Sequence, residues 1–229
     1  MPLKRIESYW IGSDIHLSGR QLQDLIGQFG RPPESEATGL NGRCSVARAQ
    51  IKGIGAAAIK SYRRGGLLRY MIKRHYLKVG RTRGQIEYEW LQTVRRLGIS
   101  APEPVAYAYR GQLIYSAWLV TREIPRALSL AQWSLTADRP LNRALKSTAD
   151  QLALLIQHGI QHVDLHPGNV LIGDNHHAFL LDFDKCRMFP GSPDILRRKY
   201  RARWNRAVRK HGLPSNLSDA IPAAGPNKE

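Results

Sequence analysis

Residues 162–184 read HVDLHPGNVLIGDNHHAFLLDFD, and they are the most informative part of this chain. Two short apolar runs, separated by the polar residues 173–177, predict a hairpin of two strands. Three oxygen-bearing side chains flank these runs: Asp164, Asn169 and Asp182. The pattern therefore predicts that the three side chains converge at one hairpin, as in a site for a metal ion and a phosphate.

These residue types suit phosphoryl transfer. Mg²⁺ takes hard oxygen ligands and offsets the charge of the moving phosphoryl group, so Asn169 and Asp182 are the predicted metal ligands. Asp164 could orient the attacking hydroxyl and accept its proton. Asp164 precedes Asn169 by the offset of the protein-kinase catalytic loop H-R-D-x-x-x-x-N, and Asp182 stands where the kinase D-F-G motif begins.

Lys60 lies near the end of a predicted apolar strand, residues 53–62, as the phosphate-binding lysine of kinases does. A lysine in this position is otherwise usually solvated. A helix with apolar positions from Ile86 to Gly98 follows, and its Glu87 is the predicted partner of Lys60, with Glu89 as the alternative. An exposed helix carboxylate is the competing interpretation.

The rest of the chain suggests a mixed set of helices and strands. Residues 1–35 give no clear pattern. Further predictions are a hairpin at 105–120, a linker at 121–125, a helix at 142–158 that ends at Gly159, and a helix that begins at the capping residue Ser192. The final stretch, 213–229, is rich in Pro, Ala, Asn and Ser and predicts a disordered tail.

The charge balance is strongly basic. The chain has 35 Lys and Arg against 18 Asp and Glu, a formal net charge of +17, which implies an anionic partner such as nucleic acid, a membrane surface or an acidic substrate. Residues 61–86 hold no acid, and the helix after Ser192 combines an apolar stripe with many cations. That helix could bind an anionic membrane surface, or its stripe could be part of the core.

Cysteine, histidine and apolar patterns narrow the class further. Cys44 and Cys186 form no Cys-x-x-Cys motif, which favours a reducing compartment. Neither a signal peptide nor a run of about 18 apolar residues is recognisable. We therefore expect a cytoplasmic, soluble or peripheral protein. Four histidines could suggest zinc, but their setting favours structural roles. They are His162, His166, His176 and His177.

With these motifs in place, the chain resembles the bacterial lipopolysaccharide core kinase family, and within it the kinases of 3-deoxy-D-manno-octulosonic acid (Kdo). The resemblance covers roughly residues 39–210. It rests on Glu87 and on three short strings: KSYRRGGL at 60–67, HVDLHPGN at 162–169 and DFDKC at 182–186.

The resemblance implies an α+β, two-lobed protein-kinase-like fold with ATP and Mg²⁺ between the lobes. A small β-rich N-lobe would span 1–122 and a mainly helical C-lobe 123–212, followed by the tail at 213–229. By the same resemblance, each site residue has one role: Lys60 binds the α and β phosphates, Glu87 orients Lys60, Asp164 is the catalytic base, and Asn169 and Asp182 hold the metal.

The resemblance also implies the reaction: ATP-dependent phosphorylation of a Kdo hydroxyl, expected to be the 4-OH, on the lipid-anchored, acidic Kdo-lipid A precursor. The enzyme would be peripheral at the anionic cytoplasmic face of the bacterial inner membrane, which disfavours nucleic acid as a partner. Two alternatives stay open, a kinase of an inner-core heptose or other small polar acceptor, and an inactive kinase-like protein that binds anionic lipid or RNA.

Some positions depart from the protein-kinase pattern. Val163 replaces the Arg of H-R-D, Asp184 replaces the Gly of D-F-G, and no Ala-Pro-Glu motif follows. Together they argue against a protein kinase regulated by activation-loop phosphorylation. The loop at 39–45 matches the kinase glycine loop poorly.

Overall fold

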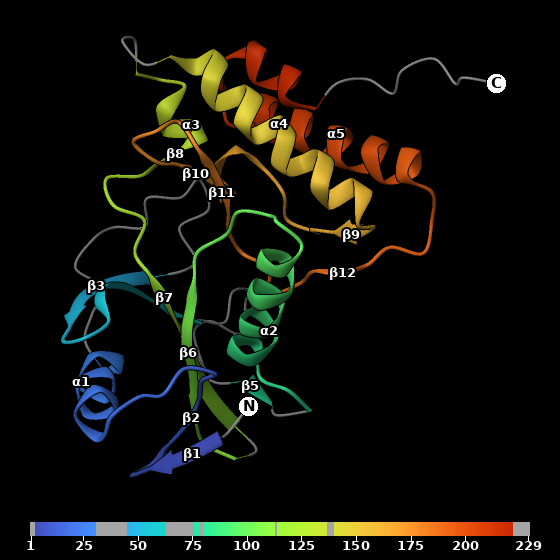
Figure 1. Ribbon diagram of the computed structural model, residues 1–229. Helices are drawn as coiled ribbons and strands as arrows, with labels where there is room; N and C mark the ends of the chain where they lie inside the picture. Colours follow the sequence, from blue (N-terminus) through green and yellow to red (C-terminus); the bar gives the residue numbers. More distant parts are fainter. Residues whose placement is uncertain are drawn as a thin grey trace. The chain divides into compact units, whose positions relative to one another are not determined.

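Figure 1 shows a computed structural model of the chain, which describes residues 3–30, 45–62, 76–77, 80–112, 114–136 and 140–221. The chain divides into two compact units. The first comprises Met1–Gln92 and Pro102–Glu123, and the second comprises Thr93–Ala101 and Ile124–Glu229. The second unit thus includes a short segment that the sequence analysis assigned to the N-lobe.

The first unit is built on an antiparallel sheet with the order β1-β2-β6-β7-β4-β3, in which β5 also pairs with β7. Its strands are β1 (Leu3–Ile6), β2 (Tyr9–Gly12), β3 (Ser45–Ile51), β4 (Gly55–Ser61), β5 (Tyr76–Leu77), β6 (Pro104–Arg110) and β7 (Ile114–Arg122). The predicted strand before Lys60 and the predicted 105–120 hairpin are confirmed as β4 and as β6 with β7.

The β3–β4 hairpin fixes the register of the strand that carries Lys60. Gly53 and Gly55 adopt positive φ of 80° and 93° in the connecting turn, a conformation that costs glycine little. Val46 then pairs with Lys60 across the two strands. Since side chains alternate along a strand, Ala57 and Ile59 are buried in the core while Lys60 belongs to the other face.

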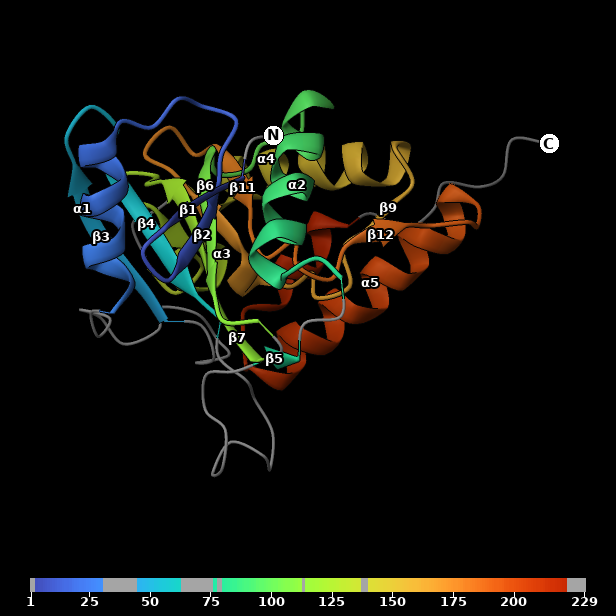
Figure 2. The same ribbon diagram turned by 90° about the horizontal axis from the view of Figure 1, so that it is seen from below.

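Helix α1 (Gly19–Phe29) packs on β3 and β4, as Figure 2 shows. Phe29 stacks on Trp118 of β7, with ring centroids 5.1 Å apart, and its carbonyl accepts a hydrogen bond from the Trp118 indole. The sequence analysis found no pattern here. The signal was nevertheless present, because Ser18 and Gln21 form a capping box at the start of α1.

Helix α2 (Arg83–Arg96) confirms the helix predicted around Glu87. The Thr82 hydroxyl accepts a hydrogen bond from the Gln85 amide at the start of the helix. At its end, Gly98 adopts φ of 79° and the Ile99 amide donates to the Val94 carbonyl at 2.9 Å. This glycine stop is the one that the sequence predicts.

The second unit combines helices with two small antiparallel sheets, ordered β11-β10-β8 and β12-β9. Its elements are β8 (Leu128–Ser129), α3 (Leu130–Trp133), α4 (Leu141–Gln157), β9 (Ile160–Gln161), η2 (Pro167–Asn169), β10 (Val170–Ile172), β11 (Ala178–Leu180), β12 (Arg187–Met188), α5 (Pro193–Lys210) and η3 (Ser215–Ala220). The predicted helices at 142–158 and after Ser192 are confirmed as α4 and α5, and the predicted hairpin as β10 with β11. The fold class is therefore α+β, as predicted.

Helix α5 settles the alternative left open by its sequence. Its apolar stripe, Leu196, Tyr200, Trp204 and Val208, is buried. The helix packs on α4 and η3, and the Trp204 indole donates to the Leu217 carbonyl at 2.7 Å. The stripe is core, and the solvent-facing residues of α5 are mostly basic, although Ile195 is exposed too.

The predicted disordered tail is wrong for residues 213–221. Leu217 and Ile221 are buried, and η3 closes over α4 and α5. Composition suggested disorder because Pro and Asn are frequent there, but two well-spaced apolar side chains are enough to bind a short segment to a core. Residues 222–229 lie outside the described part.

Other predictions fall on residues that the structure does not describe. These are the glycine-containing loop at 39–44, most of the basic run at 63–75 and 78–79, and Cys44. Within the described ranges, no helix is both long and apolar enough to cross a membrane.

Candidate active site

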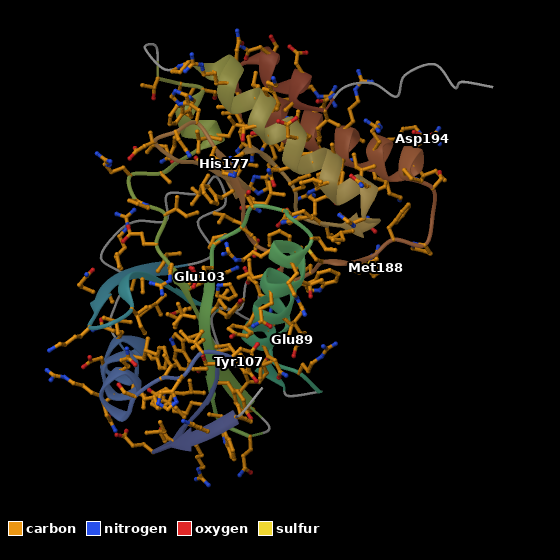
Figure 3. The ribbon with its side chains drawn as sticks, in the orientation of Figure 1. Glu89, Glu103, Tyr107, His177, Met188 and Asp194 are labelled. Atoms are coloured by element: carbon orange, nitrogen blue, oxygen red, sulfur yellow. The ribbon has the colours of Figure 1, made fainter. Side chains whose placement is uncertain are left out.

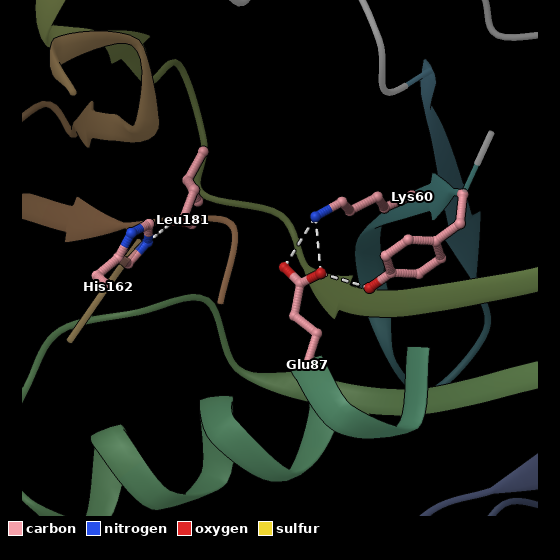
Figure 4. A network of polar contacts seen from close by, with 5 residues as sticks. Lys60, Glu87, His162 and Leu181 are labelled. Atoms are coloured by element: carbon pink, nitrogen blue, oxygen red, sulfur yellow. Dashed lines mark hydrogen bonds and ion pairs between the residues drawn. The ribbon is translucent and has the colours of Figure 1, made fainter. Parts of the chain in front are cut away.

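Lys60 forms a buried ion pair with Glu87, so the predicted partner is confirmed. The Lys60 ammonium lies 2.7 and 3.0 Å from the two carboxylate oxygens of Glu87 (Figure 4), and the two side chains are 15% and 3% exposed. Glu89, the alternative, pairs with Arg81 at the surface. The pair thus presents a fixed ammonium on the face of β4 opposite the core.

Tyr62 is a third member of this cluster. Its hydroxyl donates a hydrogen bond to the Glu87 carboxylate, its ring is buried, and the Lys60 ammonium lies 5.1 Å from the ring centroid. These contacts satisfy a carboxylate that would be costly to bury alone. Tyr62 was not among the predicted site residues, although it lies two residues after Lys60 and so on the same face of the strand.

The β10–β11 hairpin brings Asn169 and Asp182 to the same end of two adjacent strands. Val170 pairs with Leu180 in the ladder. Beyond this pair, the Leu181 amide donates to the Asn169 carbonyl at 2.9 Å. Asn169 and the residue before Asp182 are therefore joined by a backbone hydrogen bond, and the predicted hairpin of two strands is confirmed.

The loop that carries Asp164 is attached to α5 and to the hairpin. The Tyr200 hydroxyl accepts from the His162 amide at 2.8 Å and donates to the Ile160 carbonyl, and burial raises the pKa of Tyr200. His162 Nε2 donates to the Leu181 carbonyl at 2.7 Å, and its ring meets Phe183 edge-on. Figure 4 shows the His162–Leu181 bond.

The histidines have structural roles, as predicted. Burial lowers the pKa of His162 and of His166, which favours their neutral forms, and His166 Nδ1 accepts from the Gly168 amide at 3.1 Å. His176 packs edge-on against Trp133, and His177, labelled in Figure 3, lies 2.7 Å from the Ser100 hydroxyl. None of the described His, Cys, Asp and Glu residues form a cluster of three or more suited to a metal.

Asp164 is half-buried and has two contacts that define its position. Its backbone carbonyl accepts a hydrogen bond from the Asn169 side-chain amide at 2.9 Å. Its carboxylate pairs with the guanidinium of Arg203 on α5, and the Asp164 and Arg203 side chains are 27% and 42% exposed. In the sequence, Arg203 is one of many cations in the helix after Ser192, and no local pattern predicts this pairing.

Asp182 has an unusual backbone conformation. Its φ is 67°, in the left-handed region, which Asp and Asn adopt more readily than most residues. The next residue, Phe183, is fully buried, and its carbonyl accepts from the Cys186 amide at 3.1 Å. Strain of this kind persists where the surroundings fix the chain, as the buried Phe183 does here.

The donor set of the hairpin fits Mg²⁺. The Asn169 amide nitrogen is used by the Asp164 carbonyl, which leaves the amide oxygen as the atom suited to a metal ion. Asp182 has a half-buried side chain and follows Leu181, whose amide bonds to the Asn169 backbone, so its carboxylate is the second candidate donor. Mg²⁺ is usually held by one or two such side chains, together with water and phosphate oxygens.

Comparison with known proteins gives consistent matches. Residues 31–202 match the model of the lipopolysaccharide kinase (Kdo/WaaP) family. Proteins named 3-deoxy-D-manno-octulosonic acid kinase are 36% identical over 135 residues in Vibrio parahaemolyticus serotype O3:K6 (strain RIMD 2210633), 32% over 165 residues in Vibrio vulnificus (strain YJ016), and 33% over 134 residues in Stenotrophomonas maltophilia (strain K279a).

The matched stretches cover 57%, 70% and 57% of this chain and 56%, 68% and 53% of those relatives. The chain therefore spans between about half and two thirds of the length of the relatives. The family model, in contrast, covers most of this chain and includes Lys60, Glu87, Asp164, Asn169 and Asp182. On this match, the chain belongs to the lipopolysaccharide kinase (Kdo/WaaP) family.

Proposed function

We propose that this protein transfers the γ-phosphoryl group of ATP to a hydroxyl of a Kdo residue, expected to be the 4-OH, in a lipopolysaccharide precursor. The observation that supports the proposal is the hydrogen bonding that joins the Asp164 loop to Asn169, and Asn169 to the residue before Asp182, in a chain similar to proteins named for this activity. An anion-binding scaffold has no need for this set of side chains.

Asp164 is the proposed catalytic base. It orients the acceptor hydroxyl and takes its proton as the hydroxyl oxygen bonds to the γ-phosphorus, while the bond between this phosphorus and the β–γ bridging oxygen breaks and ADP leaves. The Asn169–Asp164 hydrogen bond at 2.9 Å fixes the backbone of the base. General base catalysis of this kind contributes about 10² to 10⁴ to a rate.

Lys60 is the proposed ligand of the α and β phosphates, and Glu87 and Tyr62 hold its ammonium in place. Bound Mg²⁺ would neutralise charge on the transferring phosphoryl group. Asn169 and Asp182 would hold this ion through the amide oxygen and the carboxylate.

We further propose peripheral attachment to an anionic membrane surface through charge alone. The apolar stripe of α5 is buried and cannot enter a bilayer, whereas Arg198, Lys199 and Arg206 are exposed. Each such cation near an anionic membrane contributes about 1 kcal/mol, and this attraction is screened by salt. Binding to anionic vesicles should therefore fall steeply as the ionic strength rises.

The direct test incubates the protein with ATP, Mg²⁺ and a Kdo-bearing lipid A precursor and follows phosphate transfer by mass spectrometry. Asp164→Asn should lower the transfer rate by about 10² to 10⁴ while the circular dichroism spectrum is unchanged. The matched control is Asp174→Asn. Asp174 also pairs with an arginine, Arg126, but in the exposed turn of the hairpin, so full activity is expected.

The alternatives give other results in the same assay. Transfer only to a heptose-bearing core would identify a kinase of that sugar. The absence of transfer to either acceptor, combined with vesicle or RNA binding, would favour an inactive kinase-like protein. Full activity of Asp164→Asn would remove Asp164 as the base.

A further inference from the structure

Helix α5 carries a stripe of cations that the proposed chemistry has not yet used. Its members are Lys199, Arg203, Arg206 and Lys210, and we call them the cationic stripe. Their spacings of four, three and four residues place them on one face of a helix. Lys199, Arg206 and Lys210 are exposed. The acid of α5, Asp194, lies in its first turn (Figure 3).

Arg203 connects this stripe to Asp164. Its guanidinium contacts the Asp164 carboxylate. The helix is held against this loop one turn earlier, where the Tyr200 hydroxyl bonds to both the Ile160 carbonyl and the His162 amide. Core packing through Tyr200 therefore places the backbone of α5 at Arg203 beside the loop that carries the proposed base.

The hydrogen bonds of Arg203 are incomplete among the described residues. Its Nε is buried and lacks a hydrogen-bond partner there, while Nη2 binds Asp164. A guanidinium can bind a carboxylate through two parallel hydrogen bonds, and a buried donor without a partner is costly. The buried Nε itself is out of reach of a ligand, but the Arg203 side chain is 42% exposed, so another part of its guanidinium can meet a second anion next to Asp164.

We propose that Arg203 binds the carboxylate of the acidic sugar that is phosphorylated, and that the rest of the cationic stripe binds further anionic groups of the same acceptor. This inference rests on the proposed function. The relatives' names specify an acid, and an acid approaching Asp164 would be repelled unless a cation lay between the two carboxylates. Arg203 lies against Asp164 and can supply that cation.

The length of the cationic stripe indicates that its ligand is the acceptor rather than the nucleotide. Lys199 and Lys210 are eleven residues apart, which corresponds to about 16 Å along the helix axis. A single terminal phosphate would need only one end of such a stripe. An acceptor with several separated anionic groups matches the whole of it.

The test uses water-soluble, deacylated Kdo acceptors, so that membrane binding plays no part. One acceptor keeps its carboxylate and the other carries a neutral carboxamide. A charged hydrogen bond contributes about 1.5 to 3 kcal/mol, so wild type should prefer the acid by roughly 10-fold to 150-fold in kcat/KM. Arg203→Gln should lower kcat/KM for the acid, so that the ratio of kcat/KM for the acid to that for the carboxamide is near one.

Three further measurements make the assignment specific. The KM for ATP should change less than about twofold in Arg203→Gln, and Arg203→Lys should restore part of the preference for the acid, because it keeps the charge but loses the planar fork. The matched control is Arg201→Gln. Arg201 is an exposed cation on the opposite side of α5, so its loss should leave the acid preference unchanged.

A preference for the acid that survives in Arg203→Gln would overturn the inference, as would a loss that is confined to the KM for ATP. Equal use of both acceptors by wild type would overturn it without any variant, which covers the case in which Arg203→Gln fails to fold. In both cases transfer to Kdo still occurs and the proposed function stands. If wild type transfers phosphate to neither soluble acceptor nor to the lipid-linked one, both proposals fail.

Discussion

Two ion pairs, one in each unit, involve residues of the candidate site, and they differ in burial. Lys60 and Glu87 are 15% and 3% exposed, and both carboxylate oxygens contact the ammonium. Asp164 and Arg203 are 27% and 42% exposed, and the contact uses one guanidinium nitrogen. In the first pair, the Tyr62 hydroxyl donates a further hydrogen bond to the Glu87 carboxylate, whereas the second pair is partly accessible to solvent.

This difference separates a positioning element from an exchangeable one. Breaking a buried pair leaves a charge that has lost both water and its partner, so the first pair holds one geometry. An ion pair close to water contributes little and can open at small cost. A proposed base needs a carboxylate oxygen that can receive a hydroxyl, which is consistent with the partial exposure of the second pair and with its contact through one Asp164 oxygen.

The largest expected effect follows from breaking the buried pair. Lys60→Met leaves the Glu87 carboxylate buried without its ammonium, so the free energy of unfolding should fall by about 3 to 5 kcal/mol. Chemical denaturation followed by tryptophan fluorescence measures this change. Phosphate transfer should also be lost.

The double variant Lys60→Met/Glu87→Gln is the control for charge. The Gln oxygen can still accept from Tyr62, and no charge is left buried, so much of the lost stability should return while activity does not. A Lys60→Met variant as stable as wild type would show that this pair is solvated, and the contrast between the two pairs would fail.

Tyr62→Phe should produce the next largest effect. It removes the hydroxyl that donates to Glu87, a charged hydrogen bond that contributes about 1.5 to 3 kcal/mol. We expect kcat/KM for ATP to fall about tenfold, because Glu87 then holds the Lys60 ammonium less firmly. Steady-state kinetics at varied ATP concentration measure this effect.

Tyr88→Phe is the matched control. Tyr88 is also buried and lies next to Glu87 on α2, but its hydroxyl accepts from the Asp14 amide at 2.9 Å. This variant should lose some stability and keep its KM for ATP. An equal fall of kcat/KM for ATP in the two variants would show that the Tyr62 hydroxyl contributes only to general packing.

The elements with a local signal could be predicted from the sequence. The β10–β11 hairpin, α2 with its Gly98 stop, and α5 with its Ser192 cap each depend on neighbouring residues, and all three are found. Helix α1 was missed, because its amphipathic pattern is short and only the capping box marked it. The segment after 213 was misjudged because burial of Leu217 depends on α4 and α5, not on local composition.

The residues of the candidate site also divide into those predictable from local sequence and those that depend on tertiary packing. The spacing of Asp164, Asn169 and Asp182 is local, and the hairpin ladder brings the last two together. The pairing of Asp164 with Arg203 joins residues far apart in the chain, and α5 offered eight cations around its buried stripe with nothing in the sequence to distinguish one of them. Tertiary packing through Tyr200 selects Arg203.

The pH dependence of stability tests the loop that connects these features. Burial lowers the folded-state pKa of His162 below its ordinary value of about 6.5, so the unfolded chain binds more protons than the folded one as the pH falls below 6.5. Stability should therefore be retained above pH 6.5 and decrease on acidification, by at most about 1.4 kcal/mol per pH unit for one proton.

His162→Gln should flatten this dependence between pH 7 and 5, although the variant is less stable throughout. Its amide can still donate to the Leu181 carbonyl but cannot gain a proton. His166, whose pKa is also lowered by burial, keeps part of the slope in the variant. The measurement is the free energy of unfolding by urea at several pH values. The same pH dependence in wild type and in His162→Gln would mean that His162 has the same pKa in the folded and unfolded states.

The smallest expected effect concerns the partly exposed pair, and it tests the contrast most directly. Asp164→Asn and Arg203→Gln should each change the free energy of unfolding by less than about 1 kcal/mol, since a solvent-accessible pair contributes about 0 to 1 kcal/mol. The same Asp164→Asn protein should be severely impaired in phosphate transfer, whereas Lys60→Met loses both stability and activity. A loss of 3 kcal/mol or more in Asp164→Asn would show that the Asp164–Arg203 pair stabilises the fold as a buried pair does, and the contrast between the two pairs would fail.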